Sequence, residues 1–372
     1  MLLRKKVCVA GVIAGVLLLM LASQSIQRKQ FLPLSLPLPI NQATPTSRET
    51  VPTVPPPDLT PEPPRTLPPP SIVQSEEEKP LEDSQDGLTH KRPCGCVESC
   101  ISDLGKSDWF SQRYDPKQQP VLRDTDNFDP DALKWWLNLQ RSGNDQTIEK
   151  IMSEMFQVIA SPTVDFSPLP SRCRSCAVVG NSGKLLHSGH GPLIDSYDSI
   201  IRMNKAVTRG FEKDVGNRTT YHVLYPESAV DIKHGVSLVL LPFKLRDLEW
   251  LTSALSTGTV KMTYMRVKER VQADKDKVLV VNPMFFTYVN DRWNERHGRY
   301  PSTGMLAIIF ALHICDQVSV FGYGADQQGN WHHYWEENRY AGAFRKTGVH
   351  SADFETQVIH QLAKEGKISL HL

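Results

Sequence analysis

The sequence predicts an α/β fold in which a Rossmann-like, mostly parallel central sheet is flanked by helices within a single domain, residues 93–372. Short apolar runs rich in β-branched residues alternate with helical patterns over this part of the chain. The runs are almost continuously apolar, as expected for strands that are buried on both faces of a parallel sheet. Small and polar residues follow these runs, at the edge where such sheets bind their ligands.

The N-terminal segment is predicted to lie outside this domain. An apolar run within residues 7–23 follows Arg4-Lys5-Lys6, which predicts a transmembrane signal-anchor behind a cytosolic tail, residues 1–6. A cleaved signal peptide is the alternative, because the run is short for a span of ~20 residues. Residues 24–92 hold more than half of the 27 prolines and predict a disordered stem, with a luminal domain beyond it.

Two helices are predicted ahead of the sheet, at residues 131–140 and 147–159, because apolar residues recur there at helical spacing. The Trp135-Trp136 pair of the first helix is expected to pack in the core rather than to stack on a sugar.

Six strands are then predicted, and helices at residues 245–255 and 305–315 separate some of them. The strands are expected at residues 177–180, 199–203, 221–224, 237–241, 278–281 and 318–321. This alternation predicts a doubly wound sheet, with its ligand beyond the carboxyl ends of the strands.

The residues that follow the strands supply the candidate binding groups. Gly180-Asn181-Ser182-Gly183 follows the first strand, and its glycines would let backbone N–H groups approach a phosphate or a sugar. An ordinary tight turn is the alternative. The pattern is neither G-x-G-x-x-G nor G-x-x-x-x-G-K-[ST], which argues against a dehydrogenase or a kinase. The other strand ends read Asn204, Tyr225-Pro226-Glu227-Ser228, Asn282 and Gly322-Tyr323-Gly324.

Pro301-Ser302-Thr303-Gly304 directly precedes the predicted helix at residues 305–315. Ser302 or Thr303 is expected to cap that helix, and a hydroxyl-rich helix N-terminus is also suited to a carboxylate or a phosphate. Tyr300 lies near enough in sequence to donate to the same anion.

Histidines near the C-terminus are the candidate proton-transfer groups. His332-His333 and His350-x4-Glu355 follow the last predicted strand, and imidazole titrates near neutrality. We expect His350 to act as a general base. Glu355 is expected either to orient His350 or to begin the next helix.

No catalytic metal is expected. The Asp-x-Asp pairs, at residues 124–126, 129–131 and 274–276, lie beside a predicted helix start or ahead of a strand, away from the carboxyl-end edge.

The charges are balanced, with 42 lysines and arginines against 41 aspartates and glutamates, so a nucleic-acid partner is not expected. Asn217-Arg218-Thr219 is an N-glycosylation acceptor sequence at Asn217, consistent with a luminal domain.

Six cysteines lie beyond the predicted span: Cys94, Cys96, Cys100, Cys173, Cys176 and Cys315. An oxidising lumen favours three disulfide bonds, but the residues alone do not choose the pairs. A zinc site using Cys94, Cys96, Cys100 and one more cysteine is the alternative, and the irregular spacing and the luminal setting disfavour it.

Residues 176–204, 282–324, 332–336 and 350–355 resemble the large, small, third and very small sialyl motifs of the animal sialyltransferases, in that order. The resemblance extends over residues 93–372. Residues 332–338 and 343–350 are most similar to the β-galactoside α-2,3-sialyltransferases that act on Galβ1-3GalNAc.

The resemblance implies a glycosyltransferase of modified GT-A type that uses CMP-sialic acid without a metal or other cofactor. It implies inverting transfer to the 3-hydroxyl of terminal galactose in Galβ1-3GalNAc glycans of glycoproteins or glycolipids. It also implies a single-pass type II protein of the Golgi membrane with a luminal catalytic domain, and a soluble form released by cleavage. The carrier and the oligomeric state are left undetermined.

The resemblance also assigns residues. The donor is expected to contact Asn181, Ser182, Gly183, Asn204, Tyr225, Ser228, Ser302, Thr303, Gly304 and Gly324. His333 would stabilise the departing phosphate, with Tyr264 and Tyr300 near the phosphate and the acceptor galactose. The implied disulfides are Cys94–Cys100, Cys96–Cys173 and Cys176–Cys315.

Two other functions are weighed against this one. A membrane-tethered binding protein that has lost catalysis would keep the pocket, but the intact His333 and His350 argue against it. A luminal glycosyltransferase that uses another nucleotide sugar is the second alternative. A screen of CMP- and UDP-sugars as donors, with and without chelator, would distinguish it from a sialyltransferase.

Overall fold

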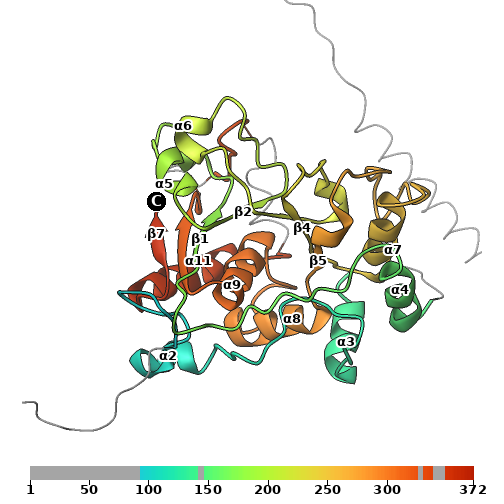
Figure 1. Ribbon diagram of the computed structural model, residues 1–372, viewed down its shortest axis with the longest axis horizontal. Helices are drawn as coiled ribbons and strands as arrows, with labels where there is room; N and C mark the ends of the chain where they lie inside the picture. The colour runs from blue at the N-terminus through green and yellow to red at the C-terminus, as the bar shows by residue number, and fades with distance from the viewer. Residues whose placement is uncertain (1–92, 141–145, 326–329, 338–347) are drawn as a thin grey trace, which may run out of the picture. The chain divides into compact units, whose positions relative to one another are not determined.

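The computed structural model describes residues 93–140, 146–325, 330–337 and 348–372 (Figure 1). The predicted tail, signal-anchor and stem lie outside these ranges, as do residue 338 and residues 343–347 of the motif resemblance. Among the described residues, no helix combines the length and apolar character needed to cross a bilayer.

A seven-stranded sheet in which every neighbouring pair is parallel forms the centre of the domain. The strands are β1 (Ser175–Val179), β2 (Ser199–Met203), β3 (Tyr221–Leu224), β4 (Ser237–Leu240), β5 (Val278–Val280), β6 (Gln317–Phe321) and β7 (Ser369–His371). All described residues belong to one compact unit, Ser84–Leu372. The predicted α/β class, parallel sheet and single domain are therefore confirmed.

The strand order places the ends of β1 and β6 next to each other. From β1 to β5 the strands add in one direction, giving β5-β4-β3-β2-β1, and β6 and β7 then add on the other side of β1. Val179, the last residue of β1, pairs with Arg202 of β2 and with Phe321 of β6. The chain leaves β1 toward β2 and leaves β6 toward β7, in the opposite direction along the sheet. The two connections therefore diverge, which opens a crevice at the carboxyl ends of β1 and β6.

Side chains of β1 alternate between two hydrophobic clusters, so both faces of the sheet are covered. Cys176 and Val178 join the large cluster that includes α9 (Thr303–Ile314), while Ala177 and Val179 join a smaller one under α5 (Gly191–Asp195) and α6 (Glu212–Val215). In Figure 1, α9 lies beside the central strands, and α5 and α6 lie together at the upper left of the view.

The predicted helices are present with slightly different ends. They are α3 (Pro130–Leu137), α4 (Ile148–Met155), α7 (Leu245–Ala254) and α9. The further helices are α2 (Asp108–Ser111), α8 (Pro283–Tyr288), a π-helical segment η5 (Val289–Trp293) and α11 (Ala352–Lys364). The short 3-10 segments are η1 (Leu104–Lys106), η2 (Gly183–Leu185), η3 (Pro226–Ser228) and η4 (Lys275–Lys277).

Trp136 of α3 is fully buried, and its Nε1 donates to the carbonyl oxygen of Pro242 at 2.8 Å. Trp135 is partly buried and packs against the same core. The expectation that this pair packs in the core is confirmed.

The six described cysteines form the three disulfide bonds that the motif resemblance implied: Cys94–Cys100, Cys96–Cys173 and Cys176–Cys315. Although Cys94, Cys96 and Cys100 are clustered, their sulfur atoms are consumed in these bonds, so they form no zinc site.

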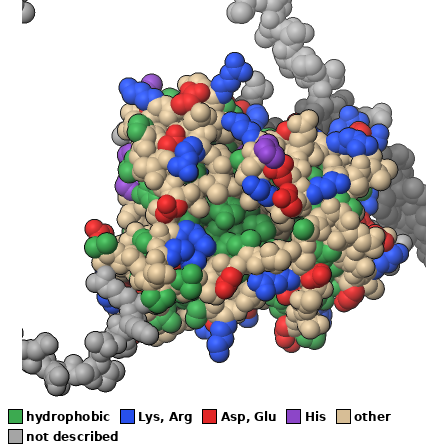
Figure 2. All heavy atoms as spheres, in the orientation of Figure 1, with side chains coloured by type: hydrophobic (Ala, Val, Ile, Leu, Met, Phe, Trp, Pro, Cys, Tyr) green, Lys and Arg blue, Asp and Glu red, His purple; other side chains and the backbone are tan. Residues whose placement is uncertain are grey.

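Lys and Arg side chains stand next to Asp and Glu side chains around an apolar centre on the face shown in Figure 2. Such mixed charge on this face contrasts with the continuous basic stripe that binds a polynucleotide backbone.

Candidate active site

A cavity of about 760 Å³ lies at the carboxyl-end edge of the sheet. The residues expected at a ligand site that line it are Asn181, Ser182, Asn204, Tyr225, Ser302, Thr303, Gly304, Gly324, His333 and His350. These residues come from seven separate parts of the chain, so the fold gathers them at the crevice between β1 and β6.

The turn after β1 is held tightly against the turn after β6. A Cβ on Gly180 would lie 2.3 Å from the carbonyl oxygen of Gly322, so only glycine fits at this approach. Ser182 donates from N to the carbonyl of Gly322 at 3.1 Å and from Oγ to that of Gly324 at 2.8 Å. These bonds fix the loop that carries Asn181.

Asn181 and Asn204 present carboxamide oxygens to this region. Asn181 donates from Nδ2 to the carbonyl of Met203 at 3.0 Å, and Asn204 adopts a left-handed backbone with φ of 59°. Both Oδ1 atoms are buried and have no hydrogen-bond partner among the described residues. Buried polar atoms are rarely left unpaired, so these oxygens are suited to accept from a bound ligand.

His222 supports Asn204 from behind. Its Nε2 lies 2.6 Å from the carbonyl oxygen of Asn204, and burial lowers the pKa of His222. Because a carbonyl can only accept, Nε2 carries the proton and the neutral ring holds the Asn204 backbone in place.

The N-terminus of α9 forms another wall. Ser302 is the N-cap, and its Oγ accepts from the N–H of Met305 at 3.1 Å. Thr303 and Gly304 begin the helix, so the capping prediction is confirmed for Ser302. The helix dipole adds partial positive charge at this end, which favours an anionic ligand.

Glu355 joins α11 to this helix start. Its Oε1 accepts from the N–H of Ser302 at 2.8 Å and from Nδ2 of Asn294 at 3.1 Å, and its Oε2 accepts from Oγ of Ser302 at 2.5 Å. Burial raises the pKa of Glu355, although the hydrogen bonds from Ser302 oppose the shift. Glu355 lies in the first turn of α11, which begins at Ala352, and binds the cap of α9.

His350 is oriented by the backbone next to α9. Its Nδ1 lies 2.9 Å from the carbonyl oxygen of Tyr300, and its ring meets the Tyr300 ring edge to face at 5.0 Å. Since the carbonyl can only accept, Nδ1 carries a proton, and in the neutral ring Nε2 is the nitrogen that can take one up. The ring therefore has the tautomer that a general base requires.

His333 lies on the other side of the cavity, beside the loop after β1. Its backbone bridges to Ser182, its ring stacks on Trp335 at 4.5 Å, and its Nδ1 lies 3.1 Å from Oε1 of Glu336. A protonated ring bound in this way to Glu336 would present Nε2–H as a donor to an anion.

Four expected residues are not among those that line the cavity: Gly183, Ser228, Tyr264 and Tyr300. The N–H of Gly183 donates to the carbonyl of His332 at 2.9 Å. Ser228 closes the turn of Tyr225, to whose carbonyl its Oγ donates at 3.1 Å. Gly183 and Ser228 therefore shape neighbouring loops in this structure.

Tyr300 and Tyr264 flank a buried ionic cluster. The hydroxyl of Tyr300 accepts from Nε2 of Gln140 at 3.0 Å, and Oε1 of Gln140 accepts from Nζ of Lys244 at 3.0 Å. Nζ of Lys244 lies 4.9 Å from the centre of the Tyr264 ring. Tyr264 is 63% exposed, so it lies on the solvent side of this cluster.

Two buried carboxylates complete this cluster. Nζ of Lys244 lies 2.7 Å from Oδ1 of Asp247 and 3.3 Å from Oε1 of Glu227. Burial raises the pKa of Asp247 to about 7, against the opposing pull of Lys244. The cluster holds Gln140 next to Tyr300, whose carbonyl in turn orients His350.

Sequence reasoning missed several cavity residues, chiefly Lys184, Asp353 and His360, although Tyr323 was already named at a strand end. Lys184 directly follows the Gly180–Gly183 turn, which was a usable signal. Asp353 and His360 carry no local signal, because only the packing of α11 brings them to this edge.

The Asp-x-Asp pairs lie elsewhere, as expected. Asp124 and Asp126 line a second cavity of about 810 Å³ that shares no lining residue with the first. Asp129 caps α3, and Asp274 accepts from the N–H of Gly235 at 2.8 Å.

The sequence of this chain is similar to those of known proteins. The family model of glycosyltransferase family 29 (sialyltransferase) matches residues 121–367. The CMP-N-acetylneuraminate-beta-galactosamide-alpha-2,3-sialyltransferase 2 of Rattus norvegicus is 52% identical over 288 residues, covering 77% of this chain and 82% of the rat protein. The corresponding sialyltransferase 1 of Homo sapiens is 47% identical over 288 residues, covering 76% and 84%.

Two solved structures of a mammalian sialyltransferase also match, each with a TM-score of 0.69 and 46% identity. Each match covers 75% of this chain and 99% of the solved chain, and one of the two structures contains Gal-beta-1-3GalNAc-ortho-nitrophenol.

Proposed function

The chain belongs to glycosyltransferase family 29, the sialyltransferases, and we propose that it transfers sialic acid from CMP-sialic acid to the 3-hydroxyl of terminal galactose in Galβ1-3GalNAc glycans. The resemblance inferred from the sialyl motifs is thus confirmed at the level of the family. Its relatives at about half identity are named α-2,3-sialyltransferases of β-galactosamides, and it is an α-2,3-sialyltransferase of β-galactosides. The bound Gal-beta-1-3GalNAc compound in a related structure supports the finer acceptor.

The orientation of His350 is the observation that carries the mechanism. With Nδ1 donating to the carbonyl of Tyr300, Nε2 can accept a proton, and the ring lines the same cavity as Asn181 and Asn204. A base in this position and tautomer suits removal of a hydroxyl proton from an acceptor.

The reaction is a single inverting displacement. The 3-hydroxyl oxygen of galactose forms the new bond to the anomeric carbon of sialic acid while the bond from that carbon to the phosphate oxygen of CMP breaks. The hydroxyl proton passes to Nε2 of His350, and the electron pair of the broken bond leaves with CMP. The donor is β-linked and the product α-linked, so no covalent enzyme intermediate is needed.

The donor would lie across the crevice. The unpaired oxygens of Asn181 and Asn204 would accept from the nucleotide, and the start of α9 at Ser302–Gly304 would face an anionic group. His333, held by Glu336, would donate to the phosphate as its charge grows. Tyr264 and Tyr300 would lie toward the acceptor.

The proposed reaction uses no metal or other cofactor, because the start of α9 and the His333 side chain can take the place of a cation near the phosphate. Transfer should therefore persist at an unchanged rate in excess chelator. Loss of activity in chelator, restored by a divalent ion, would point instead to a metal-dependent glycosyltransferase.

The cellular setting is also part of the proposal. A type II anchor at residues 7–23 and a stem at residues 24–92 would hold the catalytic domain in the Golgi lumen, with cleavage in the stem releasing a soluble form. Three disulfide bonds and an exposed Asn217, available for a glycan, are consistent with that compartment.

Replacement of His350 by alanine tests the mechanism. His350→Ala should lower kcat/KM for transfer to Galβ1-3GalNAc by about 10²- to 10⁴-fold while CMP affinity stays nearly unchanged. The measurement is initial rates with labelled donor, together with calorimetric titration of CMP. His234→Ala, at a side chain that is 95% exposed, is the matched control and should behave as the wild type. Undiminished transfer by the His350 variant would remove the assigned base.

A further inference from the structure

One positively charged side chain of the donor cavity, Lys184, has no role in the proposed mechanism. Lys184 is the only lysine or arginine among the described residues that line the cavity, whereas Asp353 and Glu355 line it as acids. A nucleotide sugar with a phosphate and a carboxylate would enter against these acids. A nearby fixed positive charge would offset that repulsion.

The backbone places Lys184 at the junction of the loops after β1 and β6. Its N–H lies 3.3 Å from Oγ of Ser182, and that Oγ in turn donates to the carbonyl of Gly324. A Cβ on Gly324 would lie 3.5 Å from Nζ of Lys184, so the ammonium group stands directly beside this glycine. The bare backbone of Gly324 leaves open the space next to the charge.

The neighbouring loop of His333 meets Lys184 at the same corner. Gly183 donates to the carbonyl of His332, and Ser182 bridges to His333. Lys184 and His333, the residue assigned to the departing phosphate, therefore lie on two segments that hydrogen-bond to each other.

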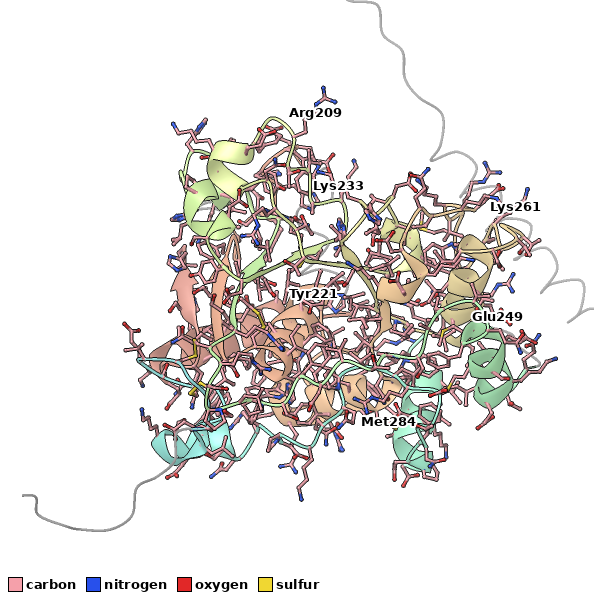
Figure 3. All side chains as sticks on the ribbon, viewed as in Figure 1. Arg209, Tyr221, Lys233, Glu249, Lys261 and Met284 are labelled. Carbon is pink, nitrogen blue, oxygen red and sulfur yellow. A yellow bond between two sulfur atoms is a disulfide. The ribbon has the colours of Figure 1, made fainter. Side chains whose placement is uncertain are left out.

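Other basic groups near this edge are already occupied. Lys205 pairs with Glu336 at 3.9 Å, and Lys244 is enclosed by Asp247 and Glu227. Arg209 extends outward from its loop (Figure 3). Among the described residues, no carboxylate forms a salt bridge with Lys184, so its charge is available to a ligand.

We propose that Lys184 binds the phosphate of the CMP moiety and supplies the fixed positive charge of the donor site. The inference rests on the proposed function, because it takes CMP-sialic acid as the ligand. The ammonium donates hydrogen bonds to the phosphate oxygens in the ground state and throughout bond cleavage. It is a binding residue, so its removal affects donor affinity more than turnover.

The test compares nucleotide affinities of wild type and Lys184→Met by calorimetric titration. The dissociation constant of CMP should rise about tenfold in the variant, because an exposed charge-assisted hydrogen bond is lost, while cytidine should bind equally to both. The KM for CMP-sialic acid should rise by a similar factor with kcat nearly unchanged. Added salt should weaken CMP binding more in the wild type than in the variant.

Lys184→Arg should keep CMP affinity within about threefold, because the charge is retained. Lys213→Met is the control, since Lys213 is an exposed lysine of α6 that does not line the cavity, and it should leave CMP binding unchanged. All the replaced side chains are exposed, so folding should be preserved.

Equal CMP affinity in wild type and Lys184→Met would overturn the inference. A loss confined to CMP-sialic acid, with CMP unaffected, would also overturn it, because the charge would then face the sialic acid carboxylate. If the wild type itself failed to bind CMP, the proposed function would fail independently of Lys184.

Discussion

At the scale of single residues, Glu355 shows how a buried charge can couple two parts of a site. Its carboxylate receives both the N–H and the hydroxyl of Ser302, although the two residues lie 53 positions apart in sequence. It lies on α11, directly after the segment that carries His350. Glu355 therefore ties the first turn of α11, which follows His350 in the chain, to the start of α9.

Replacement of Glu355 by glutamine should weaken this anchor. The NH2 group of glutamine cannot accept where one of the two carboxylate oxygens accepted, so the free energy of unfolding should fall by about 1–3 kcal/mol. The melting temperature should fall by about 2–4 °C for each kcal/mol lost, and kcat/KM measured well below melting should fall as well. Glu154→Gln, on the exposed face of α4, should change neither quantity. Unchanged melting and unchanged turnover in Glu355→Gln would contradict the anchoring role.

At the scale of elements, α9 is the helix on which the site is built. Every residue from Met305 to Ile314 is buried, so the helix is apolar on all sides and packs against the central strands. Its N-terminus faces the cavity, and its C-terminus carries His313 among the rings of Tyr114, Phe285 and Tyr288.

The buried His313 should make the stability of the domain depend on pH. Burial lowers the pKa of His313 to about 4, although the carbonyls of Ile309 and Asp115 favour the protonated ring. The unfolded chain, with a pKa of about 6.5, binds a proton first as the pH falls. The neutral ring therefore stabilises the fold above pH ~6.5, and about 3 kcal/mol of stability is lost as the pH falls from ~6.5 to ~4.

His313→Leu removes this titration. Urea denaturation at several pH values gives the free energy of unfolding of the wild type and of the variant. As the pH falls through this range, the wild type should lose stability relative to the variant. His360→Leu replaces an exposed histidine of α11, and it should show a nearly constant difference from the wild type. A constant difference for His313→Leu as well would show that His313 does not titrate on unfolding.

At the scale of the whole molecule, the disulfide bonds restrict the unfolded chain to very different degrees. Cys176–Cys315 joins residues 139 positions apart, from β1 to the end of α9, whereas Cys94–Cys100 spans 6 positions. In the chain-entropy description, the stabilisation grows with the logarithm of the loop length. The long loop should therefore be worth about 3 kcal/mol more than the short one.

Two paired variants test that difference. Cys176→Ala with Cys315→Ala should lower the free energy of unfolding by about 3 kcal/mol more than Cys94→Ala with Cys100→Ala, measured by denaturation under oxidising conditions. Each pair removes two buried sulfur atoms, so the packing losses are comparable. Equal losses in both variants would contradict a dominant entropic role for the long loop.

Local sequence was enough to find most of the sheet. The residues of β2 and β3 match the predicted ranges, and the other four predicted strands differ by one or two residues at one or both ends. Each of these strands is almost continuously apolar, so burial on both faces leaves a signal within a few residues. The short strand β7 was missed because Ser369–His371 is half exposed and carries one aliphatic side chain.

By itself, the sequence determined the fold class, the family and the residues that follow each strand, because apolar runs and motif order are local properties of the chain. Only the tertiary structure decided that the end of β1 lies beside the end of β6, that Glu355 binds Ser302 and that Lys184 faces the cavity. Crossovers of many residues set these contacts, and no local pattern encodes which distant segments meet. For the same reason, the cluster around Lys244, which joins Gln140 to Tyr300, could be seen only in the folded chain.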